Sequence, residues 1–149
     1  MCSRVTVPVR ALEGAVREFR TRRKIEFADT DLGGIVHFAR YFVFMETAEH
    51  QFLDALGTSV HIVEGDKTIG WPRVKVSCEY AGPARYGDTL DITVRVLRKG
   101  TSSMTYEIEF DIDGRRVARG ESTSVRCELG RNMRSVPIPD ELAKRIEEG

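Results

Sequence analysis

The stretch Ile25–Gly57, IEFADTDLGGIVHFARYFVFMETAEHQFLDALG, decides the fold. It predicts the end of a strand, a tight acidic turn and then a long, mostly buried helix. Asp29 and Asp31 lie in the turn, and Gly33 and Gly34 follow where the backbone needs positive φ or close approach to a ligand. Two carboxylates therefore precede a helix N-terminus, where unpaired N–H groups and the positive end of the dipole collect. This combination suits chemistry on a carbonyl group.

The predicted helix covers roughly Val36 to Leu56 and is about 30 Å long at 1.5 Å per residue. Glu49 falls inside its apolar stripe by helical angle, and the sequence shows no partner for it. A helix this apolar is expected to be enclosed by other elements. Gly57 is expected to stop it. Spacings of three and four, the helical period, separate the members of the stripe: Phe38, Tyr41, Phe42, Met45, Ala48, Phe52 and Leu56, widened by Phe44, Leu53 and Ala55.

The rest of the chain has the pattern of strands. Apolar and polar residues alternate along it, and the pair Asp113-Gly114 is a strong hairpin signal. Strands joined by hairpins form an antiparallel sheet, and a sheet with one buried helix makes an α+β domain. The predicted strands are Val16–Phe27, Ile69–Tyr80, Thr89–Arg98, Met104–Asp111 and Arg116–Cys127, followed by a short helix over roughly Asp140–Glu148.

This element order predicts one hot-dog domain over residues 15–149, in which the antiparallel sheet wraps round one long central helix. Residues 1–14 are expected to form a loose N-terminal arm. The chain has 149 residues, enough for one domain with a substantial core and too few to favour two.

The composition excludes several classes of protein. Lys plus Arg and Asp plus Glu both number 23, so no global charge favours nucleic acid. The three cysteines are odd in number and lack a CxxC spacing, which argues against a disulfide framework and favours a cytoplasmic location. No signal-peptide core and no apolar run of the ~20 residues that span a membrane is present.

Three segments carry a resemblance to a known family. They are Phe27–Asp31 with Gly34–Val36, Tyr41, Glu46 and Leu56-Gly57; Cys78–Ala84 with Gly87-Asp88; and Arg98–Ser102. Together they resemble the hot-dog acyl-CoA thioesterases of the 4-hydroxybenzoyl-CoA thioesterase type, and more narrowly the branch associated with the Tol–Pal system. The most specific of these matches is the DTD-x-x-G-I-V stretch that leads into a long helix.

The resemblance implies a role for Asp31 and for the backbone of Phe38. Asp31 would attack the thioester carbonyl as a nucleophile or activate water to do so, and both roles need an ionised carboxylate. The Phe38 N–H would hold the oxyanion, because donors at a helix N-terminus polarise a carbonyl without a side chain. The substrate would be an acyl-CoA, and no cofactor is implied apart from the coenzyme A of that substrate.

Other residues near the helix start are candidates for contact with the substrate. They are Gly34, His37 and Tyr41, while Glu46 either helps to shape the active site or is an ordinary carboxylate with a basic partner. Many relatives carry an aromatic-His pair where this chain has His37-Phe38, and Asn where it has Arg40.

No metal site is predicted. Gly33 stands where a calcium loop needs its third oxygen ligand, and the three histidines lack metal-ligand spacing. The phosphates of coenzyme A need cations, and basic side chains are candidates for this role or else form a solvated surface. These candidates are Arg98, Lys99, Arg126, Arg131 and Arg134.

The resemblance also implies a homodimer or homotetramer with its active sites between subunits. The long helix of one subunit would meet the Ser59–Lys75 region of the other. A thioesterase acting on acyl carrier protein and a non-catalytic module that binds acyl-CoA or a protein remain alternatives, whereas a dehydratase is disfavoured because the motif centres on Asp. Short, long and aromatic acyl groups all stay open.

Overall fold

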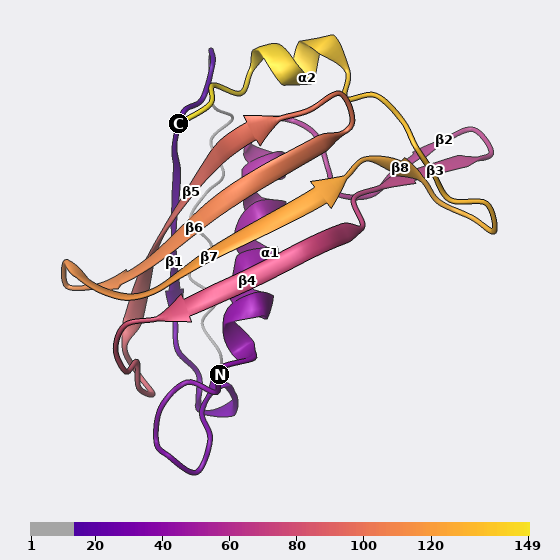
Figure 1. The fold of residues 1–149 in the computed structure, drawn as a ribbon. Helices are drawn as coiled ribbons and strands as arrows, with labels where there is room; N and C mark the ends of the chain where they lie inside the picture. The colour runs from indigo at the N-terminus through magenta and orange to yellow at the C-terminus, as the bar shows by residue number, and fades with distance from the viewer. Residues whose placement is uncertain (1–13) are drawn as a thin grey trace.

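A computed structural model describes residues 14–149, so the predicted arm lies outside them except for Gly14. The main sheet has five antiparallel strands in the order β1-β5-β6-β7-β4 (Figure 1). The turn at Asp113-Gly114 has positive φ at both residues, which confirms the predicted hairpin. The strands of this sheet are β1 Phe19–Lys24, β4 Arg73–Tyr80, β5 Thr89–Lys99, β6 Ser103–Ile112 and β7 Arg115–Val125.

The helix α1, Arg40–Ala55, lies across one face of the main sheet (Figure 1). It starts four residues later than predicted, because Val36 is still paired with Thr30 in a β-bridge and its N–H donates to the Ala84 carbonyl. Gly57 has φ +80° just beyond the helix, as expected of its stop. The predicted core faces of β5 and β6 are confirmed as buried: Leu90, Ile92, Val94 and Val96 on β5, and Met104, Tyr106, Ile108 and Phe110 on β6.

Two predicted strands differ from the observed ones. The strand predicted over Val16–Phe27 is limited to β1, because Val16 instead bridges to Ile146 and residues 27–29 form the 3₁₀ helix η1, Phe27–Asp29. The strand predicted over Ile69–Tyr80 is divided at Trp71-Pro72 into β3, Lys67–Gly70, and β4, which belong to different sheets. Proline removes a backbone donor, so it interrupts a ladder at this point.

A second, four-stranded sheet projects beyond the main sheet (Figure 1). It contains β2 Ile62–Glu64, β3, β8 Cys127–Glu128 and β9 Arg134–Ser135. The predicted strand to Cys127 therefore ends at Val125, and Cys127 lies in β8. The C-terminal helix α2, Asp140–Lys144, is shorter than the range predicted for it. Within residues 14–149, no helix has the length and apolar character needed to cross a membrane.

Candidate active site

The acidic turn lies at one end of the main sheet, and its backbone fixes the Asp31 side chain. Asp31 N–H donates to the Ile35 carbonyl and Gly34 N–H donates back to the Asp31 carbonyl, so the loop is closed at both ends. Gly33 N–H donates to Asp31 Oδ1 at 2.8 Å. A side chain at Gly33 would bring its Cβ within 3.1 Å of that oxygen, which explains the glycine. Asp31 is exposed, and its second carboxylate oxygen stays available to a ligand.

Asp29 is the buried member of the DTD pair and is bound to two arginines. Its Oδ1 accepts from Arg40 Nη2 at 2.7 Å and Nε at 3.0 Å, and lies 3.4 Å from Arg23 Nη2. Its Oδ2 accepts from the Glu26 N–H at 2.9 Å. These bonds connect β1, η1 and the start of α1. The Asp29 side chain is fully buried, so a substrate cannot reach it.

Of His37, Phe38 and Ala39, the three residues directly before α1, one has a backbone N–H without an acceptor. His37 N–H donates to the Asp29 carbonyl, Ala39 N–H to His37 Nδ1 at 3.2 Å, and Arg40 N–H to the His37 carbonyl. Among the described residues, the Phe38 N–H makes no hydrogen bond. This donor follows the Asp31 turn and precedes a helix, which are the conditions for stabilising a negative oxygen.

The predicted contact residues at this end of the molecule have different surroundings. Gly34 is exposed and has φ +73°, which only glycine adopts without strain. His37 is half-buried, and its ring stacks on that of Phe38. Tyr41 is buried in the core, with ring contacts to Phe44, Tyr80 and Phe110, and burial raises its pKa to about 12. Tyr41 is therefore a core residue that packs beneath the site, and a substrate cannot contact it directly.

The fold brings two of the three matched segments together and holds the third apart. Val36 N–H donates to the Ala84 carbonyl at 2.8 Å, and the Tyr80 hydroxyl donates to the Phe38 carbonyl at 2.8 Å. Arg98 and Lys99 lie at the opposite end of β5, whose 11 residues span roughly 33 Å.

Several of the basic side chains that are candidates for phosphate binding already have hydrogen-bond partners within the chain. Lys99 Nζ donates to the Ala143 and Ile146 carbonyls of the α2 region, at 2.7 and 2.6 Å, while Arg98 is exposed. Arg126 donates to the Pro137 carbonyl and Arg134 to Glu128, while Arg131 is exposed. None of them lies near Asp31 in the same chain, so their phosphate-binding role stays a prediction.

Arg73, at the start of β4, supplies the partner of Glu49 that the sequence did not reveal. Arg73 Nη2 lies 2.6 Å from Glu49 Oε2, and Nη1 lies 3.4 Å from Glu46 Oε2. The Glu46 side chain is 51% exposed and that of Glu49 only 4%. Burial raises the pKa of the Glu49 carboxyl, against the opposing effect of the Arg73 guanidinium.

The raised pKa of Glu49 predicts a pH-dependent stability. The folded state binds the Glu49 proton more tightly than the unfolded state does. Protonation of Glu49 therefore contributes fully to the free energy of unfolding below the ordinary Glu pKa of about 4.3, and this contribution is lost as pH rises through the raised pKa. Denaturant unfolding from pH 4 to 8 should therefore show a wild-type stability that falls relative to Glu49→Gln as pH rises. The matched control is Glu46→Gln, which removes the exposed partner of Arg73. If the wild-type and Glu49→Gln curves run parallel, the interpretation is wrong.

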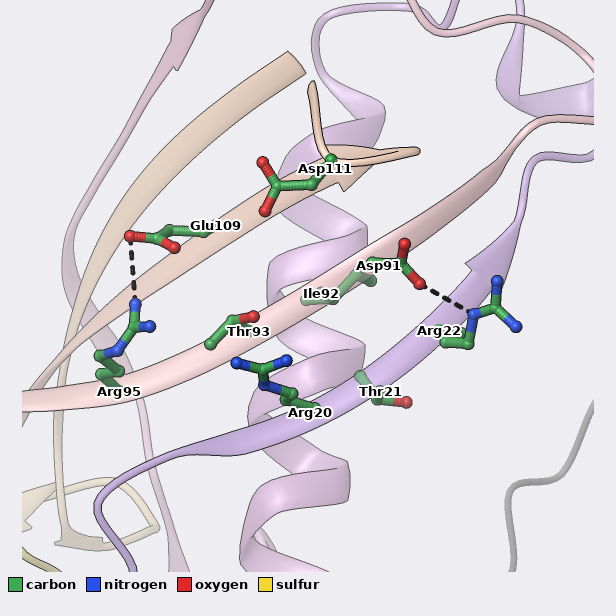
Figure 2. A pocket seen from close by; sticks show the side chains of 10 residues that line it. Arg20, Thr21, Arg22, Asp91, Ile92, Thr93, Arg95, Glu109 and Asp111 are labelled. Carbon is green, nitrogen blue, oxygen red and sulfur yellow. Dashed lines mark hydrogen bonds and ion pairs between the residues drawn. The ribbon is translucent and has the colours of Figure 1, made fainter. Parts of the chain in front are cut away.

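A hollow on the other side of the sheet is not part of this site. Figure 2 shows it on the outer face of β1, β5 and β6, with α1 behind the sheet. Its lining includes ion pairs such as Arg22–Asp91 at 2.8 Å and Arg95–Glu109 at 3.1 Å, and includes no residue of the Asp31 turn.

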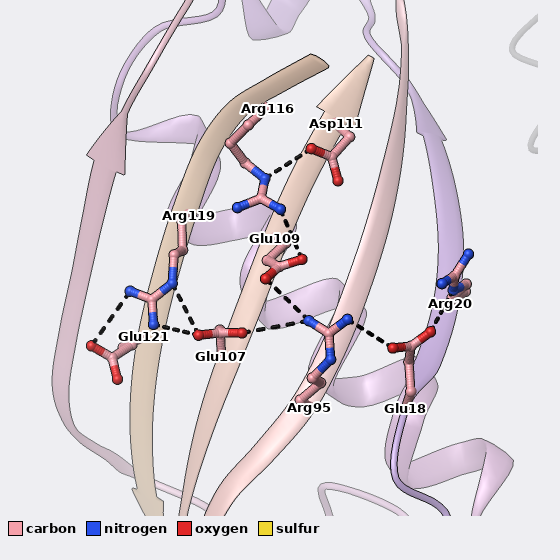
Figure 3. Close-up of polar contacts among 9 residues, drawn as sticks. All are labelled: Glu18, Arg20, Arg95, Glu107, Glu109, Asp111, Arg116, Arg119 and Glu121. Carbon is pink, nitrogen blue, oxygen red and sulfur yellow. Dashed lines mark hydrogen bonds and ion pairs between the residues drawn. The ribbon is translucent and has the colours of Figure 1, made fainter. Parts of the chain in front are cut away.

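The hollow shares Arg95, Glu109 and Asp111 with a network of ion pairs across four strands (Figure 3). Arg95 contacts Glu18, Glu107 and Glu109, and Arg119 contacts Glu107 and Glu121. A surface so fully charged is unsuited to an apolar acyl group, which directs attention to the end of the sheet beside α1.

Three contacts of the site were missed by sequence reasoning: Tyr80 with Phe38, Arg73 with Glu49, and Arg40 with Asp29. Tyr80 and Arg40 were noted as matched or unusual positions, but no local pattern pointed to these pairings. In the part of the chain that the structure describes, no group of three or more His, Cys, Asp or Glu side chains is placed to hold a metal ion.

Comparison with known proteins gives a consistent result. A family model described as the thioesterase-like superfamily matches residues 25–146. The 1,4-dihydroxy-2-naphthoyl-CoA hydrolase of Thermosynechococcus vestitus is 31% identical over 123 residues, which cover 81% of this chain and 83% of that protein.

Solved structures agree with this family. The gentisyl-coenzyme A thioesterase BH1999 superposes with a TM-score of 0.73 at 26% identity, over 84% of this chain and 99% of that one. The 4-hydroxybenzoyl CoA thioesterase of Pseudomonas sp. strain CBS-3 superposes with a TM-score of 0.74 at 20% identity, over 87% of this chain and 99% of that one, and shares the fold.

Proposed function

The chain belongs to the thioesterase-like superfamily, and on that premise we propose that it hydrolyses an acyl-CoA thioester to the free acid and coenzyme A. Its named relatives are thioester hydrolases. The observation that carries the proposal is the free Phe38 N–H at the start of α1, directly after the turn that presents Asp31. A carboxylate oxygen and a backbone donor on the same short segment ahead of a helix match the needs of acyl transfer.

The proposed reaction uses Asp31, one backbone donor and water. As a nucleophile, an Asp31 oxygen bonds to the thioester carbon, the C–S bond breaks to release coenzyme A, and water then hydrolyses the mixed anhydride. As a general base, Asp31 instead takes a proton from the water that attacks. In both cases Phe38 N–H stabilises the negative carbonyl oxygen. After a single turnover in ¹⁸O water, ¹⁸O in the Asp31 carboxylate would identify the anhydride route with water attacking the Asp31 carbonyl carbon. The general-base route, and attack of water on the acyl carbon of the anhydride, both place the ¹⁸O in the released acid.

We propose an aromatic acyl group as the substrate class. The naphthoyl and gentisyl groups in the names of two relatives are aromatic. Aromatic side chains also flank the Asp31 turn in the sequence, and both Phe27 and Phe38 are exposed there. The narrower assignment to the Tol–Pal-associated branch stays a prediction from the motifs.

The test is thiol release from a panel of short, long and aromatic acyl-CoAs, with aryl thioesters expected to be hydrolysed fastest. Faster hydrolysis of aliphatic thioesters would contradict the acyl preference alone. If folded protein hydrolysed none of the acyl-CoAs in the panel, the proposed activity would be contradicted. That result would favour either an acyl group attached to a carrier protein as substrate or a non-catalytic binding module.

We propose further that two copies pair through β4 to form the hot-dog dimer, with α1 as the central helix of each unit. β4 is the last strand of the main sheet, and among its exposed side chains are Val74 and Val76, with Lys75 between them. The other edge strand, β1, has four basic residues among six, against two among eight in β4, and is therefore less suited to pairing. Antiparallel pairing about a two-fold axis would bring the second copy's Ser59–Lys75 region beside the Asp31 turn.

This dimer predicts a specific sensitivity to charge on β4. Val76 is in register with the buried Ser122, so it lies on the helix side of the sheet, whereas Ser77 faces the outer side. Sedimentation equilibrium should give a dimer for the wild type and for Ser77→Asp. For Val76→Asp, the dissociation constant of the dimer should rise at least tenfold. A wild-type monomer, or equal effects of the two substitutions, would contradict pairing through β4.

A further inference from the structure

The two peptide groups that flank the Phe38 Cα are both held by hydrogen bonds. In the peptide before it, the His37 carbonyl accepts from Arg40 N–H at 2.9 Å. In the peptide after it, the Phe38 carbonyl accepts from the Tyr80 hydroxyl at 2.8 Å, and Ala39 N–H donates to His37 Nδ1 at 3.2 Å. Neither φ nor ψ of Phe38 can therefore change without breaking one of these bonds.

Tyr80 is 47% exposed, and its ring is attached to the core through Tyr41. Tyr80 is the last residue of β4, and its ring packs edge-on against Tyr41 with centroids 5.4 Å apart. Tyr41 is buried and packs in turn against Phe110 of β6, with centroids 5.3 Å apart. Burial raises the pKa of Tyr80 to about 12, so the hydroxyl keeps its proton and remains a donor. The position of the Phe38 peptide is thus tied to the packed face of the main sheet.

The His37 side chain binds the same peptide through its N–H group. Its Nδ1 accepts from Ala39 N–H at 3.2 Å. Its ring is stacked on that of Phe38, with centroids 4.7 Å apart and an interplanar angle of 28°. The side chain therefore restrains both the Phe38 ring and the peptide that follows it.

We propose that Tyr80 and His37 are positioning residues that clamp the Phe38–Ala39 peptide and so keep the Phe38 N–H directed at the substrate oxygen. The inference rests on the proposed function and deepens it. A backbone donor cannot be improved by changing its own side chain, so its alignment depends on the groups that bind the neighbouring peptides. Neither residue needs to touch the acyl group for this role.

The test uses the full-length protein and the variant Tyr80→Phe, which removes only the hydroxyl. Because an aligned oxyanion donor stabilises the transition state more than bound substrate, kcat should fall about tenfold while KM changes less than twofold. This loss is smaller than the ~10²–10³-fold expected when such a donor is absent altogether. The matched control is Tyr86→Phe, an exposed tyrosine at the same end of the molecule, which should keep wild-type kcat and KM.

A second variant tests the clamp itself. His37→Phe keeps a stacking ring and removes the Nδ1 acceptor, so it should also lower kcat. The double variant should lose less kcat than the product of the two single losses, because both residues act on one peptide. Amide hydrogen exchange supplies a readout without turnover: Ala39 N–H should exchange several-fold faster in Tyr80→Phe and in His37→Phe, and at the wild-type rate in Tyr86→Phe.

The outcomes separate the two proposals. Wild-type kcat together with wild-type exchange at Ala39 in Tyr80→Phe would overturn the clamp while leaving the thioesterase proposal intact. A rise in KM with unchanged kcat would also overturn it, because it would make Tyr80 a substrate contact. If the wild type hydrolysed no thioester, the activity proposal would fail, and the exchange measurement would still decide whether Tyr80 and His37 hold this peptide.

Discussion

Replacing Asp31 with Asn is expected to lower kcat for the best acyl-CoA substrate by ~10²–10⁴-fold, the range that a positioned acid–base group contributes. Asn has nearly the shape of Asp, and its Oδ1 can still accept from Gly33 N–H, so the turn is retained. The substitution removes the negative charge, and with it the ability to attack the carbonyl or to take a proton from water. KM should change little, because the loss falls on the transition state.

The measurement is thiol release by wild type and Asp31→Asn, with thermal unfolding of both proteins. Asp113→Asn is the control, since Asp113 is exposed in a hairpin turn and has φ 48°, a conformation that Asn tolerates. The control should keep full activity, and Asp31→Asn should unfold at nearly the wild-type temperature. Hydrolysis that survives in Asp31→Asn would show that the reactive carboxylate has been misassigned, and Glu46 would be the next candidate to test.

Asp29→Asn is expected to have the opposite profile, with a large loss of stability. Removing one partner of a buried ion pair costs about 3–5 kcal/mol, because the other charge is left unpaired. Arg40 and Arg23 are partly exposed and can regain some hydration, so about 3 kcal/mol of unfolding free energy is expected to be lost. The new amide N–H₂ group would also face either the Glu26 N–H or the arginines, all of which are donors.

Thermal unfolding should show a Tm lowered by roughly 10 °C, since 1 kcal/mol corresponds to about 2–4 °C in a chain of this length. The control is Asp91→Asn, which removes an exposed pair with Arg22 and should cost less than about 1 kcal/mol. A stable Asp29→Asn protein with abolished turnover would contradict this division and place the reactive charge at Asp29.

The two aspartates of the DTD turn differ because of what surrounds them. They lie two residues apart in the same acidic turn, and the local sequence gives little reason to assign them different roles. In the folded chain, Asp29 is enclosed by Arg40 from α1 and Arg23 from β1, whereas Asp31 is turned outward and held by one backbone N–H. The arginine before the helix tyrosine, an unusual residue at that position, thus completes a structural ion pair.

Positions within the main sheet follow from the sequence because its pattern is local. Alternation along Leu90–Val96 and Met104–Phe110 places one apolar face on each strand, and the observed faces agree. The Asp113-Gly114 turn needs positive φ at both residues, and these residue types permit it. The helix stop at Gly57 is local in the same sense. Such features depend on the period of the chain or on the conformation of single residues.

The ends of elements were predicted less well, because contacts with distant segments decide them. Val36 to Ala39 have the composition of a helix start, yet bonds to Thr30, Ala84 and Asp29 keep Val36 and His37 out of the helix. Phe38 and Ala39 then form a turn, and α1 begins at Arg40. The division of Ile69–Tyr80 into two strands depends on which partner each half finds: β3 pairs with β8, and β4 pairs with β7.

The sequence by itself determined the α+β class, the antiparallel hairpins, the apolar faces and the acidic turn ahead of the helix, since each of these is written in the spacing of near neighbours. Only the tertiary structure decided that Tyr80 reaches Phe38, that Arg73 pairs with Glu49, and that Arg98 lies a strand's length from Asp31. These pairings join residues tens of positions apart, and they arise from the register of the sheet and the packing of α1 on it, which no local pattern encodes.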